Sequence, residues 1–189
     1  MNTTPSSLRI ALQSGLLLAL AAATGPGCIV KTEVIRQGPD LNGTTERQNV
    51  EHALDTLHSA ASSADGETYF ALFDPGATYY GTDASELWSV EDFKAFAEPY
   101  FSKGRGWTYH VTERHVHFSP SYDTAWFDER LENESYGETR GTGVLIRRGP
   151  PGSAWHITQY NLSFPVPNEL AGGLVEQIRG LAKDGQQDR

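Results

Sequence analysis

The chain has 189 residues, enough for one folded domain together with an export segment, because single cores typically take about 100–200 residues. A hydrophobic fraction of 38% with eight Phe, eight Tyr and four Trp excludes wholesale disorder. The 24 acidic and 15 basic residues give a formal net charge of -9 and form no dense basic stripe, which argues against nucleic-acid binding and against charge-driven attachment to anionic membranes.

Residues 1–27 are typical of a signal peptide. Arg9 precedes an uncharged, largely apolar stretch over 10–24 that leads to Cys28. This run of about 15 residues is shorter than the roughly 20 that a helix needs to span a bilayer, so a cleaved signal is favoured over a permanent anchor.

Cys28 is the only cysteine, so the chain cannot form an intramolecular disulfide. Gly27 directly before it makes the site resemble a bacterial lipobox, in which the cysteine is lipidated and becomes the mature N-terminus. Gly25 departs from the usual Leu, Val or Ile three residues before the cysteine. The resemblance implies an exported protein tethered to a bacterial membrane, in the periplasm or at the cell surface. The alternative is an ordinary signal peptide cut nearby, which leaves a free thiol.

Composition divides the mature chain into three parts. Residues 28–46 show no apolar periodicity, and they are expected to form the lipidated N-terminus and a flexible tether. The folded domain is expected over 47–183, and 184–189 form a polar tail that is expected to be disordered.

The first half of the domain reads as helical. Apolar residues three or four apart predict an amphipathic helix from Arg47, and a short second helix follows over 69–73, ended by Asp74-Pro75-Gly76. Residues 77–80 have the composition of a strand. Ser89 is placed to cap a third helix with a broad aromatic face.

In the second half of the domain, apolar and polar residues alternate with a period of two. It predicts four long strands, over 107–118, 123–133, 138–148 and 154–164. Turn-forming segments separate the strands, so they are expected to form an antiparallel meander, followed by a short C-terminal helix. The order predicts an α+β fold, with three N-terminal helices packed on one face of a cone-shaped, curved antiparallel sheet.

Several spaced blocks resemble SnoaL-like proteins of the nuclear transport factor 2-like superfamily. They are Leu72-Phe73-Asp74-Pro75, Gly81-Thr82-Asp83 with Trp88, Phe96-Ala97-Glu98-Pro99-Tyr100-Phe101, Ala125-Trp126-Phe127-Asp128-Glu129, Gly141-Thr142-Gly143-Val144-Leu145 and Ser163-Phe164-Pro165-Val166-Pro167-Asn168. The resemblance covers 47–183 and implies a pocket at the open end of the cone and dimers formed through the exposed face of the sheet, which sedimentation would test. The fold alone does not set an activity, because it hosts isomerases, cyclases, dehydratases, hydrolases and binding modules.

Two adjacent carboxylates on one expected strand are the candidate catalytic residues. Alternation puts Asp128 on the face shared by Trp126 and Arg130, and Glu129 on the opposite face. A carboxylate desolvated by aromatic rings would gain a pKa suited to a general acid or base. The simpler interpretation is an ion pair on the outer face with Arg130 or Arg140.

Five residues are candidates for contact with a ligand: Trp88, Tyr100, Trp126, Gln159 and Asn161. Alternation places Gln159 and Asn161 on the same strand face as Trp155 and Ile157, and their amides suit recognition better than proton transfer. Most aromatic residues are expected to be core, with one or two lining the pocket.

Metal and cofactor chemistry has little support in the sequence. His115 and His117 share a strand face, but a third ligand is not evident, so no metal site is predicted. The chain has no nucleophile elbow, phosphate loop or dinucleotide fingerprint, and no cofactor is expected.

Two functional hypotheses remain. The favoured one is a membrane-tethered module that binds a small apolar or aromatic molecule in its cone or acts as a dimeric interaction module. The alternative is a cofactor-independent isomerase or cyclase that uses Asp128 or Glu129 as a proton shuttle, with Tyr100, Gln159 or Asn161 stabilising an oxyanion.

Overall fold

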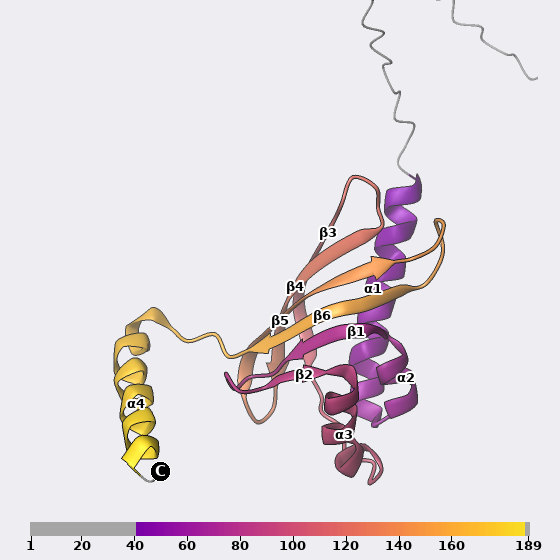
Figure 1. Cartoon of the computed structure of the whole chain (residues 1–189). Coiled ribbons are helices and arrows are strands. Elements are labelled where there is room, and N and C mark those ends of the chain that lie inside the picture. The colour runs from indigo at the N-terminus through magenta and orange to yellow at the C-terminus, as the bar shows by residue number, and fades with distance from the viewer. Residues whose placement is uncertain (1–40, 188–189) are drawn as a thin grey trace, which may run out of the picture. The chain divides into compact units, whose positions relative to one another are not determined.

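The computed structural model describes residues 41–187, which form one α+β domain (Figure 1). Its elements in chain order are α1 (Leu41–Ser63), α2 (Gly66–Ala71), β1 (Phe73–Tyr80), β2 (Leu87–Ser89), α3 (Val90–Phe101), β3 (His110–Phe118), β4 (Thr124–Asn133), β5 (Gly137–Arg147), β6 (Trp155–Ser163) and α4 (Asn168–Gln187). The expected signal peptide, Cys28 and most of the expected tether lie outside the described residues.

A single curved, open sheet contains all six strands, in the order β2-β1-β6-β5-β4-β3. The meander of β3 to β6 is antiparallel throughout, as the turn signals predict. One pair departs from the expected antiparallel pattern, because β1 runs parallel to β6 with Tyr79 opposite Tyr160. The predicted fold class is confirmed.

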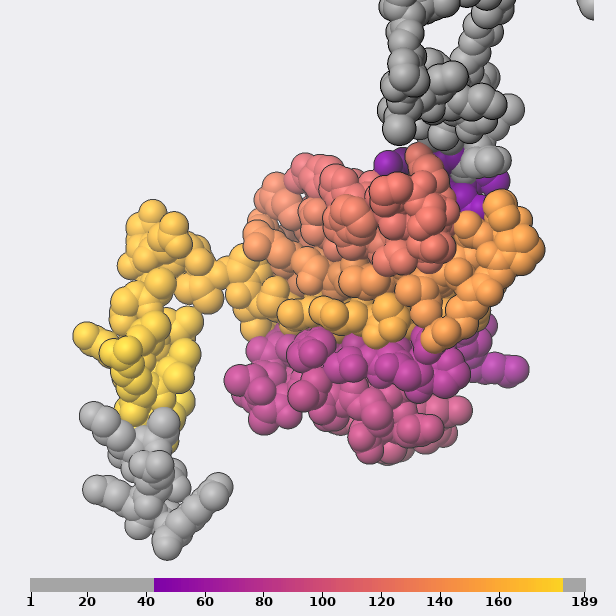
Figure 2. Space-filling view, turned by 45° about the horizontal axis from the view of Figure 1, so that its top comes forward, coloured from indigo at the N-terminus to yellow at the C-terminus, as the bar shows by residue number. Residues whose placement is uncertain are grey.

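The two faces of the sheet differ in how far other elements cover them. On the inner face, α1 contacts β6 and the edge strand β3, and β4 contributes buried Phe127, Glu129 and Leu131. The residues of β4 that alternate with these buried ones lie on the outer face, where they are exposed or partly exposed to solvent. Figure 2 shows this outer face as a continuous surface of β3 to β6, in salmon to orange. Each large apolar side chain buried beneath α1 contributes about 1.5–3 kcal/mol to folding.

The N-terminal boundary of the domain differs from the prediction. Helix α1 begins at Leu41, inside the segment that was expected to be a flexible tether. The reason is Glu46, which is only 2% exposed and accepts hydrogen bonds from the Trp155 indole N–H at 2.8 Å and the Gly152 amide at 3.0 Å. A polar residue in a polar stretch gave no sign of these long-range contacts.

The sequence Asp74-Pro75-Gly76 was expected to separate a helix from a strand. In the structure it lies within β1. Phe73 already pairs with Ile157 of β6, and the register shifts before the pairing resumes at Thr78. This irregularity accommodates the proline, which has no N–H to donate to a sheet.

The segment before β3 is not a strand, although its alternation predicted one from 107. Trp107 donates its backbone N–H to the Ala61 carbonyl at 3.2 Å and packs its ring against the core. Gly106 is needed for this approach, because a Cβ there would lie 1.9 Å from the Ala61 oxygen. Packing on the end of α1 therefore delays β3 until His110.

Helix α4 extends to Gln187, so part of the expected tail is helical. Its apolar stripe is exposed: Leu170, Leu174, Val175, Ile178 and Leu181. Among the helices of the described chain, none is long and apolar enough to cross a membrane.

Candidate functional site

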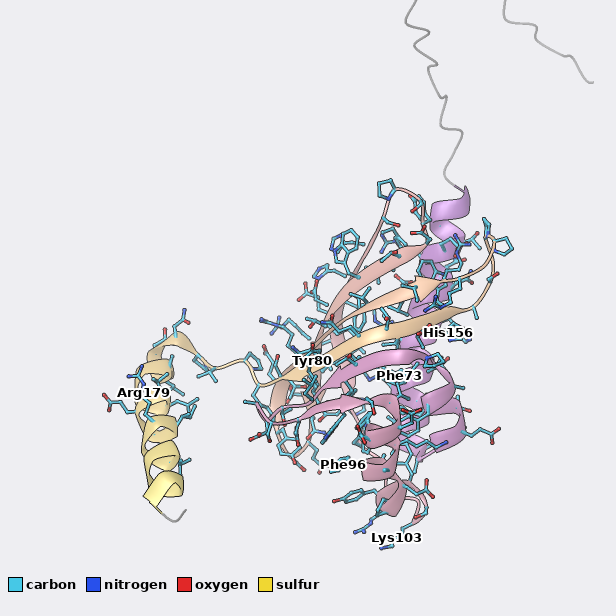
Figure 3. The ribbon with its side chains drawn as sticks, viewed as in Figure 1. Phe73, Tyr80, Phe96, Lys103, His156 and Arg179 are labelled. Atoms are coloured by element: carbon cyan, nitrogen blue, oxygen red, sulfur yellow. The ribbon has the colours of Figure 1, made fainter. Side chains whose placement is uncertain are left out.

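An aromatic pocket of about 330 Å³ opens beside β1, β2 and α3. We call it the aromatic pocket, and its lining residues are Tyr79, Gly81, Thr82, Glu86, Trp88, Phe93, Phe96, Trp107, Tyr109, Tyr136, Leu162 and Phe164. These residues belong to β1, β2, α3 and β6 and to turns and irregular segments between elements. Figure 3 shows Phe96 on α3, next to the strands of this region.

Four of the lining rings are close to parallel. The centroids of Trp88 and Phe96 lie 4.7 Å apart, those of Trp88 and Phe93 5.3 Å, and those of Phe93 and Tyr79 3.8 Å. The interplanar angles of these pairs are 27°, 11° and 21°. Parallel rings are the arrangement in which a flat molecule adds a further layer with favourable stacking.

Tyrosine hydroxyls supply neutral polar groups at the pocket. Burial raises the pKa of Tyr79 and that of Tyr109, so both hydroxyls stay protonated and are able to donate a hydrogen bond at neutral pH. Tyr69 lies deeper, where burial raises the pKa of its hydroxyl well above its usual range. The pocket therefore combines apolar walls with a few polar groups, as small-molecule sites usually do.

Glu86 supplies the charge at the pocket. Its Oε2 accepts the Asp83 N–H at 3.1 Å and lies over Gly81, where a Cβ would be 2.1 Å from that oxygen. The carboxylate also contributes to the raised pKa of Tyr79, after the larger effect of burial. The turn between β1 and β2 thus fixes one anionic group at the pocket wall.

Glu129 faces the inside of the domain and is fully buried. Its Oε1 accepts from the Arg114 Nε at 2.5 Å, and its Oε2 lies 2.8 Å from the His58 Nε2. Arg114 also donates to the Asp55 carboxylate at 2.7 Å. Both oxygens of Glu129 are engaged, which is the arrangement of an internal ion-pair network between α1, β3 and β4.

Asp128 lies on the outer face, where its Oδ2 is 2.9 Å from the His115 Nδ1. The hydrogen bond and charge of Asp128 raise the pKa of His115. Of the two candidate carboxylates, only Glu129 points into the domain. Asp128 instead has the surface ion pair that the simpler interpretation describes, with histidine in place of arginine.

Gln159 and Asn161 do not share a face with Trp155 and Ile157, contrary to the alternation argument. Gln159 is exposed, and buried Tyr160 occupies the inner position between the two amides. The physical cause is a bulge, since the β5–β6 register shifts between Val144 and Leu145 and inverts the faces beyond it.

The three aromatic candidates have different positions. Trp88 lines the aromatic pocket. Tyr100 is 43% exposed and stacks beneath the Arg105 guanidinium, and Trp126 is 47% exposed on the outer face, stacked on His117. The structure therefore brings together Trp88 and residues outside the candidate set, but not Tyr100, Trp126 and the two amides.

Sequence reasoning missed Glu86, Tyr109 and Tyr136 as pocket residues. All three lie in turns or irregular segments, where no periodicity indicates the direction of a side chain. Within the described residues, no group of three potential metal ligands is present, and His115 contacts carboxylates instead.

Comparison with known proteins identifies the domain. A family model described as a SnoaL-like domain matches residues 50–167, more than half of the chain. Among curated proteins, none matches.

Solved structures share the fold at low sequence identity. A nuclear transport factor 2-like protein of unknown function from Pseudomonas putida KT2440 has a TM-score of 0.55 and 16% identity, covering 67% of this chain and 91% of its own. A protein of unknown function from Mycobacterium tuberculosis has a TM-score of 0.56 and 12% identity, covering 71% and 80%. A protein from Streptomyces avermitilis, provisionally named a dehydratase of the same superfamily, has a TM-score of 0.54 and 15% identity, covering 66% and 99%. From the family model and the shared fold, the chain belongs to the SnoaL-like domain family, with a nuclear transport factor 2-like architecture.

Proposed function

We propose that this domain binds a small, flat aromatic or apolar molecule in the aromatic pocket, and that a lipid on Cys28 holds it at a bacterial membrane. The observation that carries the binding proposal is the stack of near-parallel rings of Tyr79, Phe93, Trp88 and Phe96, which lines a hollow of about 330 Å³. A hollow of this size fits a small ligand and lies at the lower end of the usual range for binding sites.

Binding is favoured over proton-transfer chemistry by the state of the inward carboxylate. Glu129 is sealed from solvent and holds Arg114 and His58 through its two oxygens. A general base must instead reach a proton of the substrate directly or through one water. Glu129 is not among the residues that line the aromatic pocket.

A thermal-shift screen with flat aromatic compounds tests the binding proposal. We expect ligands to raise the melting temperature of the protein, because they bind only the folded state. Trp88→Ala removes one ring of the stack and is expected to weaken the best ligand about tenfold or more, as measured by titration calorimetry.

Trp126→Ala is the matched control, because Trp126 is exposed on the outer face. It should leave the affinity unchanged. Equal losses in the two variants, or a folded Trp88→Ala protein that binds normally, would exclude the aromatic pocket as the site.

The lipid anchor is tested by Cys28→Ser in a bacterial host. The unchanged protein should partition into the detergent phase, and the mass of its N-terminal peptide should include a diacylglyceryl group. The variant is expected to stay in the aqueous phase. Aqueous partition of both proteins would refute the anchor and leave the binding proposal untouched.

A further inference from the structure

The aromatic pocket carries negative charge but no positive charge among the lining side chains that the structure describes. Glu86 is the only lining residue with a formal charge at neutral pH, and no lysine, arginine or histidine is among the lining residues of this described pocket. The other polar side-chain groups of the lining are neutral, namely hydroxyls and the indole N–H groups of Trp88 and Trp107, and buried Tyr79 keeps its proton. A bound anion would therefore meet a carboxylate without any compensating cation.

The aromatic walls of the pocket favour a cation, as this carboxylate does. The faces of Trp, Tyr and Phe rings carry negative electrostatic potential and attract organic cations, with Trp the strongest. Trp88, Trp107 and Phe96 line the pocket and keep solvent-accessible surface, whereas the rings of buried Tyr79 and Phe93 are stacked on each other. Aromatic rings with one carboxylate and no basic residue form a site suited to an ammonium or pyridinium-type group.

The position of Glu86 leaves it able to pair with such a group. Only its Oε2 is used in the turn, by the Asp83 N–H, and Oε1 has no hydrogen-bond partner among the residues the structure describes. Glu86 is partly buried, so its attraction for a cation is screened less than at an open surface.

We infer that the ligand of the aromatic pocket is a small, flat organic cation, whose ring stacks with the aromatic walls and whose positive charge faces Glu86. This inference rests on the proposed binding function and names its ligand class. The near-parallel rings select flatness, and Glu86 selects charge.

Calorimetric titration of the full chain with two probes of similar shape tests the inference. N-methylquinolinium carries a permanent positive charge, and 4-methylquinoline is neutral at pH 8. We expect the cation to bind at least about tenfold more tightly than the neutral probe. Glu86→Gln keeps an oxygen for the Asp83 N–H, and it should weaken the cation by a similar factor while leaving the neutral probe unchanged.

Glu132→Gln removes the same unit of charge from an exposed position on β4 and is the matched control. It should preserve the preference for the cation, and melting temperatures of both variants verify that they fold. Equal binding of the two probes, or a preference that survives Glu86→Gln, overturns the cation inference while the binding proposal stands. If a range of flat aromatic compounds, charged and neutral, fails to bind, both fail.

Discussion

Replacing Glu129 with Gln is expected to lower the free energy of unfolding by about 3 kcal/mol, measured by urea denaturation. The substitution keeps the shape of the side chain but removes the charge that faces Arg114 and His58. The loss is large because the side chain of Arg114 is only 11% exposed, and its guanidinium would be left with Asp55 as its remaining ionic partner.

Asp55→Asn is the control for this prediction. The Asp55 side chain is 68% exposed, so the same type of substitution should cost no more than about 1 kcal/mol. A double variant, Glu129→Leu with Arg114→Met, should recover part of the stability, because it removes both buried charges together. A Glu129→Gln protein as stable as the unchanged one would show that the network contributes nothing to folding.

Glu46→Ala is expected to destabilise the domain by about 3 kcal/mol, because it leaves the Trp155 indole N–H and the Gly152 amide without their acceptor and removes the carboxylate that pairs with the Arg147 guanidinium. These contacts fasten α1 to β5, β6 and the turn between them. The matched control is Gln48→Ala, an exposed position one residue beyond Arg47 on the same helix, which should change the stability by less than about 0.5 kcal/mol.

The Glu46 contribution should also depend on pH. Burial opposes ionisation of Glu46, but the Trp155 and Gly152 hydrogen bonds and the charge of Arg147 outweigh it and lower the pKa. The stabilisation is therefore fully present above the unfolded-state pKa of about 4.3 and is lost as the pH falls through the lower folded-state value. The stability difference between the unchanged protein and Glu46→Ala should shrink in acid, and a difference that grows there would contradict the assigned contacts.

The fold was predictable because its elements carry local signals. Period-two segments separated by turn residues predicted all four strands of the meander, and Ser89 caps α3 as expected. The boundaries that were wrong depend on contacts distant in sequence. Glu46 reaches Trp155, and Phe73 pairs with Ile157, which no local pattern indicates.

The site was less predictable than the fold for the same reason. Alternation correctly separates Asp128 from Glu129, but it gives no sign of the bulge in β6, so it assigned Gln159 and Asn161 to the wrong face. Glu86 and Tyr136 join the aromatic pocket through turns, whose side-chain directions are set only when the strands pair.

The central claim is that ligand binds at the aromatic pocket, and the four tryptophan indole N–H signals in a ¹⁵N-correlation spectrum test it most directly. Trp88 and Trp107 line the pocket, Trp126 lies on the outer face, and Trp155 donates to Glu46. On titration with N-methylquinolinium, we expect the Trp88 and Trp107 signals to shift together while the other two stay in place. A saturable shift confined to Trp126 or Trp155 would place the ligand elsewhere and contradict the account.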